Sequence, residues 1–243
     1  MEEDQYIRIN KYLSEVGFCS RRAADKLLAE ARITINGKVP ELGTKVGPTD
    51  VVAVDGESVG KPKQVHTYIA FNKPVGIVST TDTKGEKDNI IDYIGHPQRI
   101  FPIGRLDKDS EGLIFLTSEG DIVNKILRAK NNHEKEYIVT VDRPVNDEFI
   151  RLIGAGVPIL DTVTDPCRVE RISKFKFRII LTQGLNRQIR RMCEHFGFKV
   201  VQLKRIRIMN VHLDIPVGKW RDLTDKEMAE INDMISDSSK TFD

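Results

Sequence analysis

The segment Gly104–Thr117 reads GRLDKDSEGLIFLT and brings a cluster of carboxylates next to a short apolar run. The run Leu113–Leu116 predicts a buried β-strand. Glycines at both ends of the cluster favour a turn-rich loop over a helix. The three carboxylates belong to Asp107, Asp109 and Glu111. Because catalytic groups are often carried by a loop that a rigid strand holds in place, this acidic loop is the first candidate for a functional site.

Two other interpretations fit the acidic loop. Acidic loop residues are most often solvated surface residues, and composition alone does not exclude this. A calcium-binding loop would also begin with this spacing of acidic residues before a glycine. However, its twelfth position is Ser118, where a bidentate glutamate is needed, and Pro102 and Gly104 disrupt the required entering helix. The calcium interpretation is therefore disfavoured, whereas the solvated loop stays open.

Length and composition predict a globular protein with one large or two unequal domains. The chain has 243 residues, of which 40% are hydrophobic and 30% charged, as in ordinary soluble proteins. No apolar run reaches the ~20 residues of a membrane-spanning helix, so no membrane association is expected. The N-terminal sequence MEEDQYIRIN is acidic, unlike a signal peptide, which predicts a cytoplasmic protein. The cysteines are far apart and form no CxxC motif, so neither a disulfide framework nor a zinc site is expected.

Positive charge is concentrated in one part of the chain. Between Asp165 and Arg221 there are 14 Lys or Arg residues against 4 Asp or Glu residues, a surplus of +10. From Asp222 onward 2 basic residues face 7 acidic ones, so the net charge of +2 conceals the asymmetry. A segment this basic predicts a polyanionic partner.

Paired arginines lie at the start of a helix near the N-terminus. Ser20 is a typical N-cap, and the apolar spacing after it predicts a helix to about Ala31. The positive charges of Arg21 and Arg22 in the first turn are unfavourable near the positive end of the helix dipole. Their position therefore indicates that they bind phosphate groups together with the N–H groups of the first turn. A solvated helix start remains the alternative. The dipeptide Asn36-Gly37 predicts a hairpin turn after a short strand.

A second helix also begins with arginines. Asn186 is the expected N-cap and Gly197 the expected end of the helix. Three arginines occupy its positive half, where helix stability alone would not place them. Four basic residues follow along the next strand pair: Lys199, Lys204, Arg205 and Arg207. Of these basic residues, Arg187, Arg191, Lys204 and Arg205 are predicted to contact RNA. The alternating run Lys135–Val141 predicts a strand that carries Tyr137, whose ordinary role would be core packing.

The N-terminal segment resembles an S4 RNA-binding domain in the runs INKYLSEVGFCSRRAADKLL, ITINGK and VGPTDVVAVDG. In such domains a helix pair and the following hairpin form the RNA-binding surface. The resemblance implies RNA contacts by Arg8, Lys11, Arg21 and Arg22. We expect an S4 domain over 6–60, a linker over 61–65 and a catalytic domain over 66–243.

Four further runs resemble the RsuA/RluF-type pseudouridine synthases: FNKPVGIVST, FPIGRLDKDSEGLIFLT, EKEY and QGLNRQIRRMCEHFG. The resemblance implies an α+β protein, with a small S4 (αL-type) domain before a mixed, mainly antiparallel sheet with flanking helices. It implies isomerisation of a uridine in 23S ribosomal RNA, and in some relatives of a tyrosine-tRNA anticodon uridine. A ribosomal or pre-ribosomal RNA partner, a monomer, and a reaction without cofactor or metal are expected.

The resemblance also implies roles for individual residues. Asp107 matches the catalytic carboxylate, and Arg190 matches the arginine that pairs with it. Tyr137 matches the tyrosine that stacks on uracil and takes the C5 proton. Leu203 matches an apolar residue near the base. Arg105 is expected to contact a phosphate or to fill the stack that the flipped nucleotide leaves.

Two alternatives of other functional classes remain open from the sequence. A catalytically inactive RNA-binding or ribosome-assembly protein would need the S4 segment and the basic surface, but not Asp107, Tyr137 and Arg190 together. An RNA N-glycosidase would use similar carboxylate chemistry and release the free base. Analysis of the reaction products separates all three classes.

Overall fold

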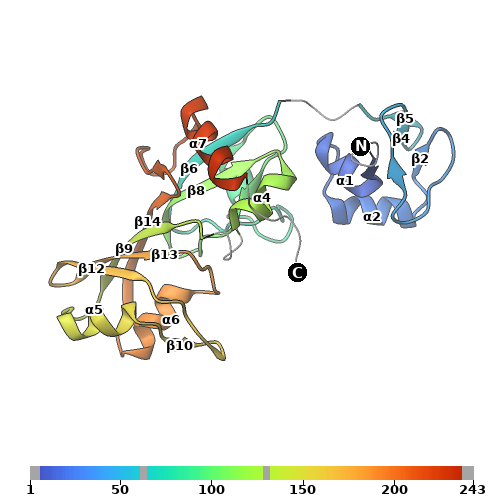
Figure 1. Ribbon diagram of the computed structural model, residues 1–243. Coiled ribbons are helices and arrows are strands. Elements are labelled where there is room, and N and C mark those ends of the chain that lie inside the picture. Colours follow the sequence, from blue (N-terminus) through green and yellow to red (C-terminus); the bar gives the residue numbers. More distant parts are fainter. Residues whose placement is uncertain (1–5, 61–64, 128–131, 237–243) are drawn as a thin grey trace. The chain divides into compact units, whose positions relative to one another are not determined.

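The computed structural model describes residues 6–60, 65–127 and 132–236, which form two units (Figure 1). The N-terminal unit runs to His66 and includes Pro97–Arg99. The C-terminal unit comprises Thr67–His96 and the chain from Ile100 onward. Of the predicted linker, residues 61–64 lie outside the described residues.

The described residues of the N-terminal unit form two short helices and five short strands. The capping of the second helix is as predicted, because the Ser20 hydroxyl accepts a hydrogen bond from the Ala23 N–H at 3.1 Å. The helix ends at Ala29, earlier than expected, since Ala31 has a φ of 54° and is exposed. The elements are β1 (Ile7–Arg8), α1 (Ile9–Glu15), α2 (Arg21–Ala29), β2 (Ile33–Ile35), β3 (Lys45–Val46), β4 (Val52–Val54) and β5 (Glu57–Ser58).

The predicted hairpin turn at Asn36-Gly37 is confirmed. Both residues have positive φ, 52° and 78°, which this dipeptide tolerates better than others. β2 and β4 pair in antiparallel fashion, and apolar side chains from both helices and from these strands form one buried cluster. The unit therefore has its own small core.

The C-terminal unit is built on one nine-stranded sheet with the order β12-β13-β9-β14-β8-β6-β16, to which β15 and β7 add at β14 and β8. All of its pairings are antiparallel except that of β14 with β8. The expected mixed, mainly antiparallel sheet is thus confirmed. The strands of this sheet are β6 (Tyr68–Lys73), β7 (Phe101–Ile103), β8 (Glu111–Thr117), β9 (Lys135–Val141), β12 (Arg168–Ser173), β13 (Lys176–Leu181), β14 (Val200–Ile208), β15 (Val211–His212) and β16 (Trp220–Asp222). A separate antiparallel pair is formed by β10 (Pro158–Ile159) and β11 (Thr162–Val163).

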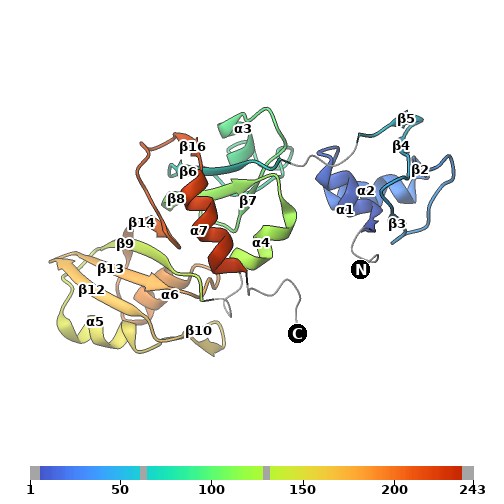
Figure 2. The ribbon, with the colours of Figure 1, turned by 45° about the horizontal axis from the view of Figure 1, so that its top comes forward.

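Helices cover both faces of this sheet. On one face α3, α5 and α6 pack into a cluster with Ile114 and Leu116 of β8. On the other face α4 and α7 pack on Leu113 and Phe115 of the same strand (Figure 2). Burial on both faces explains why β8 is a continuous apolar run rather than an alternating one. The helices are α3 (Ile90–Ile94), α4 (Gly120–Leu127), α5 (Asp147–Gly154), α6 (Gln188–His195) and α7 (Asp225–Ile235).

The parallel contact between β8 and β14 depends on Gly112. Its φ is 118°, and a Cβ atom there would lie 2.2 Å from the backbone carbonyl oxygen of Arg205. Glycine is therefore the residue that lets the two strands approach. This approach places Arg205 opposite the beginning of β8, directly after the acidic loop.

Candidate active site

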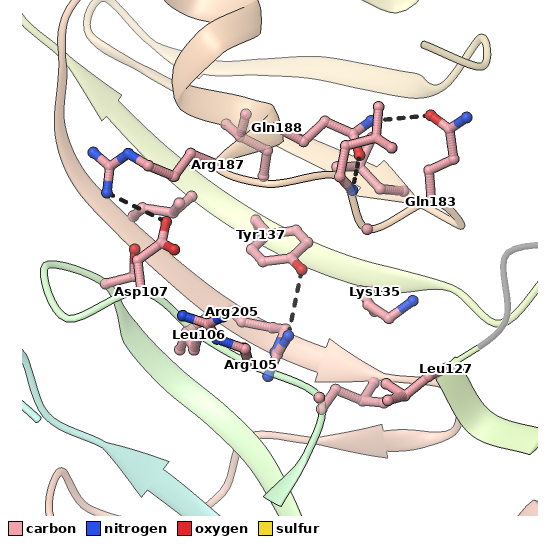
Figure 3. Close-up of a pocket in the computed structure, with 18 of the residues that line it drawn as sticks. Arg105, Leu106, Asp107, Leu127, Lys135, Tyr137, Gln183, Arg187, Gln188 and Arg205 are labelled. Atoms are coloured by element: carbon pink, nitrogen blue, oxygen red, sulfur yellow. Dashed lines mark hydrogen bonds and ion pairs between the residues drawn. The ribbon is translucent and has the colours of Figure 1, made fainter. Parts of the chain in front are cut away.

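A cavity of about 430 Å³ in the C-terminal unit lies beside the acidic loop (Figure 3). It is lined by residues of the loop, of β9 and β14, and of the segment that leads into α6. Asp107 lies at one end of the view and Lys135 at the other, with Tyr137 and Arg205 between them. The resemblance leads us to expect Asp107, Tyr137 and Arg190 in one pocket, and of these Asp107 and Tyr137 line this cavity.

The backbone around Asp107 is held by hydrogen bonds on both sides. The buried Ser79 hydroxyl donates to the Leu106 carbonyl oxygen at 2.8 Å and accepts from the Leu106 N–H at 3.1 Å. The Asp107 carbonyl oxygen accepts from the Ser110 N–H at 3.0 Å, and the Gly76 N–H donates to the Lys108 carbonyl oxygen at 2.7 Å. These bonds fix the loop backbone, whereas the Asp107 side chain remains partly exposed.

Arg187 is the arginine nearest to Asp107 among the ion pairs of the described residues. Its Nη1 lies 3.6 Å from Asp107 Oδ2 and 3.2 Å from Asp109 Oδ1. The prediction that Asn186 is the N-cap of this helix is wrong. The helix α6 begins at Gln188, and the residue before it is Arg187, with a left-handed φ of 50°. The ion pairs of Arg187 with Asp107 and Asp109 are tertiary contacts that a capping pattern does not encode.

Arg190 does not line the cavity but lies buried behind the acidic loop. Its Nη2 donates to the Asp109 carbonyl oxygen at 2.9 Å and to Ser110 Oγ at 3.1 Å, and lies 3.3 Å from Asp109 Oδ2. Partial burial raises the pKa of Asp109. The hydrogen bond from Arg187 and the charges of Arg190 and Arg187 lower it by more, so this pKa lies below its ordinary value. The described residues thus place Arg190 on Asp109, not on Asp107, so the expected direct pair is absent from this arrangement.

Tyr137 and Arg205 form the middle of the cavity wall. Tyr137 is paired with Arg205 across β9 and β14, and the Arg205 guanidinium carbon lies 5.9 Å from the centre of the Tyr137 ring. Leu203, two residues earlier on β14, lines the cavity as expected for an apolar residue near the base. Arg205, one of the predicted RNA-contacting residues, is only 4% exposed and lines the cavity, where its Nε donates to the Leu113 carbonyl oxygen at 2.6 Å.

Lys135 is a cavity residue that the sequence analysis did not single out. It lies two positions before Tyr137 on β9 and therefore on the same face of the strand. Its Nζ donates to the carbonyl oxygens of His133 and Thr182, at 3.3 Å in both cases. Burial and the charge of Arg205 lower the pKa of Lys135 to about 8. The strand alternation could have indicated its position, although not its burial.

The other predicted RNA-contacting residues are distributed over the two units. In the C-terminal unit Arg105 is exposed at the cavity rim, Lys204 pairs with Glu111 at 2.8 Å, and Arg191 bonds to Asn186. In the N-terminal unit three of the four are exposed: Arg8, Arg21 and Arg22. The fourth, Lys11, pairs with Glu15 at 3.4 Å.

Two other features are absent from the part of the chain that the structure describes. In residues 6–60, 65–127 and 132–236 there is no group of three His, Cys, Asp or Glu side chains that could hold a metal ion. Within the same ranges no helix is long and apolar enough to cross a membrane.

Comparison with known families gives the reaction class. The model of the RNA pseudouridylate synthase family matches residues 67–195, and the S4 domain model matches residues 7–52. The chain belongs to the RNA pseudouridine synthases. It is therefore an isomerase that acts on RNA, as the resemblance implied.

Individual relatives of this pseudouridine synthase support the same conclusion. The dual-specificity RNA pseudouridine synthase RluF of Escherichia coli K12 is 58% identical over 242 residues, which are 98% of this chain and 83% of RluF. The ribosomal large subunit pseudouridine synthase B of Bacillus subtilis is 33% identical over 97% of this chain and 99% of its own. A crystal structure of a pseudouridylate synthase superposes with a TM-score of 0.68 at 27% identity, over 93% of this chain and 99% of the other.

Proposed function

We propose that this pseudouridine synthase isomerises a uridine of 23S ribosomal RNA and that Asp107 is its catalytic carboxylate. The observation that supports this most directly is that Asp107 and Tyr137 line one cavity, although 30 positions apart in the sequence. The ribosomal substrate is supported by the similarity to RluF and to a ribosomal large subunit enzyme.

The reaction breaks the C1′–N1 bond, rotates the uracil and joins C5 to C1′. An ionised carboxylate can attack or stabilise C1′ as it becomes electron-poor, and Asp107 is partly solvent-accessible at the cavity wall. Arg187 places a positive charge beside this carboxylate, with its Nη1 3.6 Å from Asp107 Oδ2. Tyr137 offers a ring face to the uracil and a hydroxyl for the C5 proton.

The target nucleotide must leave the RNA stack to reach the cavity. Unstacking costs a few kcal/mol, which contacts with the RNA backbone must offset. Arg105 and Arg187 are both exposed at the cavity and are the side chains best placed to hold the flanking phosphates. The exposed arginines of α2 supply a second group of RNA contacts in the S4 domain.

The experiment uses unmodified 23S ribosomal RNA and unmodified tyrosine tRNA, both made by transcription. After incubation, the RNA is digested and its nucleosides are separated by chromatography with mass detection. We expect pseudouridine, of unchanged mass, in the 23S RNA. Reaction with the tRNA alone would refute the ribosomal assignment, and release of uracil would indicate a glycosidase instead.

Asp107→Asn tests the catalytic carboxylate. We expect isomerisation to fall by at least about 1,000-fold, because the substitution removes the charge that acts at C1′. RNA binding, measured by filter retention, should stay near the wild-type value. Asp88→Asn, which removes an exposed carboxylate outside the cavity, is the matched control and should retain activity. Turnover by Asp107→Asn at the control rate would refute the role of Asp107.

A further inference from the structure

Arg205 carries an unsatisfied buried nitrogen in the cavity. Its Nε donates to the Leu113 carbonyl oxygen at 2.6 Å, and its Nη1 lies 3.5 Å from the Tyr137 hydroxyl. Its Nη2 is shielded from solvent and has no hydrogen-bond partner among the residues that the structure describes. A buried guanidinium nitrogen without an acceptor is costly, so its presence in a cavity indicates a ligand that brings one.

A second cation lines the same cavity. Lys135 is 7% exposed, and both of its hydrogen bonds to carbonyl oxygens are long, at 3.3 Å. An ammonium group has three donors, which leaves one for a ligand. Burying two like charges near each other is unfavourable unless an anion joins them. In Figure 3 Lys135 lies at the opposite end of the view from Asp107, and Arg205 lies between them, below Tyr137.

The chemistry of the reaction supplies such an anion. When the C1′–N1 bond breaks, its electron pair stays with the uracil, whose negative charge spreads over N1 and the two carbonyl oxygens. The anion rotates, and C5 forms the new bond to C1′ with an electron pair of the ring. The C5 proton then leaves and N1 gains a proton, so that the product is an isomer of the substrate.

We infer that Arg205 and Lys135 bind the carbonyl oxygens of this detached uracil anion and stabilise it while the base turns. The inference rests on the proposal that Asp107 acts at C1′, since it places the sugar at the Asp107 end of the cavity and the base toward the two cations. It assigns leaving-group stabilisation to residues of the cavity interior rather than to the acidic loop. Such donors stabilise a delocalised negative charge most strongly in a cavity that holds little water.

Three substitutions to methionine test the inference: Arg205→Met, Lys135→Met and the control Arg207→Met. Arg207 lies on the same strand as Arg205 but pairs with Glu136 and Glu134 and does not line the cavity. Rates are measured in a single turnover with enzyme in excess, which isolates the chemical step. Thermal melts verify that each variant is folded, and Lys135→Met keeps the test available if Arg205→Met does not fold.

The decisive comparison is between two short RNAs that carry either uridine or 5-fluorouridine at the modified position. Fluorine withdraws electrons and makes the uracil anion easier to form, so it reduces the need for cations. Arg205→Met and Lys135→Met should each slow reaction of the uridine RNA by about 100-fold. Their defects should be smaller with 5-fluorouridine RNA, by on the order of tenfold. Consumption of the target nucleoside is followed by mass-detected chromatography.

A purely structural role gives a different pattern. Loss of packing or of a backbone contact would slow both RNAs by the same factor, as we expect for Arg207→Met. Equal defects on both RNAs in Arg205→Met and Lys135→Met would overturn the inference. Any RNA uridine that the enzyme modifies can serve as the target, so this outcome is independent of the 23S assignment. Retained activity in Asp107→Asn would refute the proposed role of Asp107. It would not make the defects of Arg205→Met and Lys135→Met equal on the uridine and 5-fluorouridine RNAs, so the two failures can be told apart.

Discussion

Arg190 holds the backbone of Asp109 through a 2.9 Å hydrogen bond from its Nη2 to the Asp109 carbonyl oxygen. The same nitrogen reaches Ser110 Oγ, and Nη1 donates to the Val200 carbonyl oxygen at 3.3 Å. One buried guanidinium therefore links the acidic loop to the beginning of β14. In this arrangement Arg190 positions the loop that carries Asp107, while Arg187 provides the nearby positive charge.

Arg190→Gln should destabilise the protein as well as slow the reaction. The shorter amide cannot reach all three partners, so buried oxygens lose their donors at about 1–3 kcal/mol. Urea unfolding measures the stability, and single-turnover rates measure the activity. Arg191→Gln is the neighbouring control, because the described hydrogen bonds of Arg191 go to Asn186 of the preceding loop. Equal stability of the two variants would contradict the positioning role.

Gly112→Ala should damage the fold more than Gly76→Ala. Both glycines have positive φ, 118° and 95°, but a Cβ atom at Gly76 meets nothing within 4 Å. We expect Gly76→Ala to cost about 1 kcal/mol of backbone strain. Gly112→Ala adds a collision with the Arg205 backbone and should cost at least about 3 kcal/mol. Urea unfolding of both variants measures the difference, and equal losses would show that β8 and β14 can move apart.

The single-turnover rate should decline above a pH of about 8. Lys135 carries its charge below its pKa of about 8 and loses it as the pH rises through that value. If this charge stabilises the uracil anion, the rate is highest when Lys135 is protonated and falls on the alkaline side. The other titratable or charged groups that line the cavity are Arg105, Asp107, Tyr137, Arg187 and Arg205.

Lys135→Met provides the control for this pH profile. The variant has no ammonium group at this position, so its alkaline decline should disappear while its rate stays low throughout. Rates are measured between about pH 6 and 9.5, with intact RNA verified at each pH. An unchanged alkaline decline in the variant would assign the titration to another group.

Arg21→Ala combined with Arg22→Ala should weaken RNA binding and its dependence on salt. Both side chains are exposed at the start of α2, where N–H groups and positive charge favour phosphate. The slope of log K against log salt concentration should become shallower by about 1–2 units. Arg32→Ala is the control, because Arg32 already pairs with Asp55 at 2.6 Å. An unchanged slope in the double variant would remove α2 from the RNA-binding surface.

The sequence predicted elements whose signals are local. The predicted strand Lys135–Val141 has the same bounds in the structure, and Asn36-Gly37 forms the expected turn. The α+β class with a mixed sheet is likewise confirmed. In these cases side-chain alternation and turn chemistry determine the structure without distant contacts.

What the sequence could not provide depends on tertiary contacts. Arg205 belongs to a strongly basic segment, yet the close parallel approach at Gly112 buries it in a cavity. Arg190 was paired with Asp107 by resemblance, whereas the left-handed turn at Arg187 brings that neighbouring arginine closer to it. Charge patterns predict a basic surface equally well for buried and exposed arginines. Only the packed strands distinguish them.

The reciprocal hydrogen bonds between Ser79 and Leu106 bear on how recognition is divided between enzyme and RNA. They anchor the residue next to Asp107 to a different segment of the chain, so the carboxylate starts from a preset position. The enzyme then has little rearrangement to make at this point. The RNA must therefore undergo most of the distortion that the reaction needs. The preference for one uridine over another should follow the free energy that each RNA site needs to flip its nucleotide out of the stack.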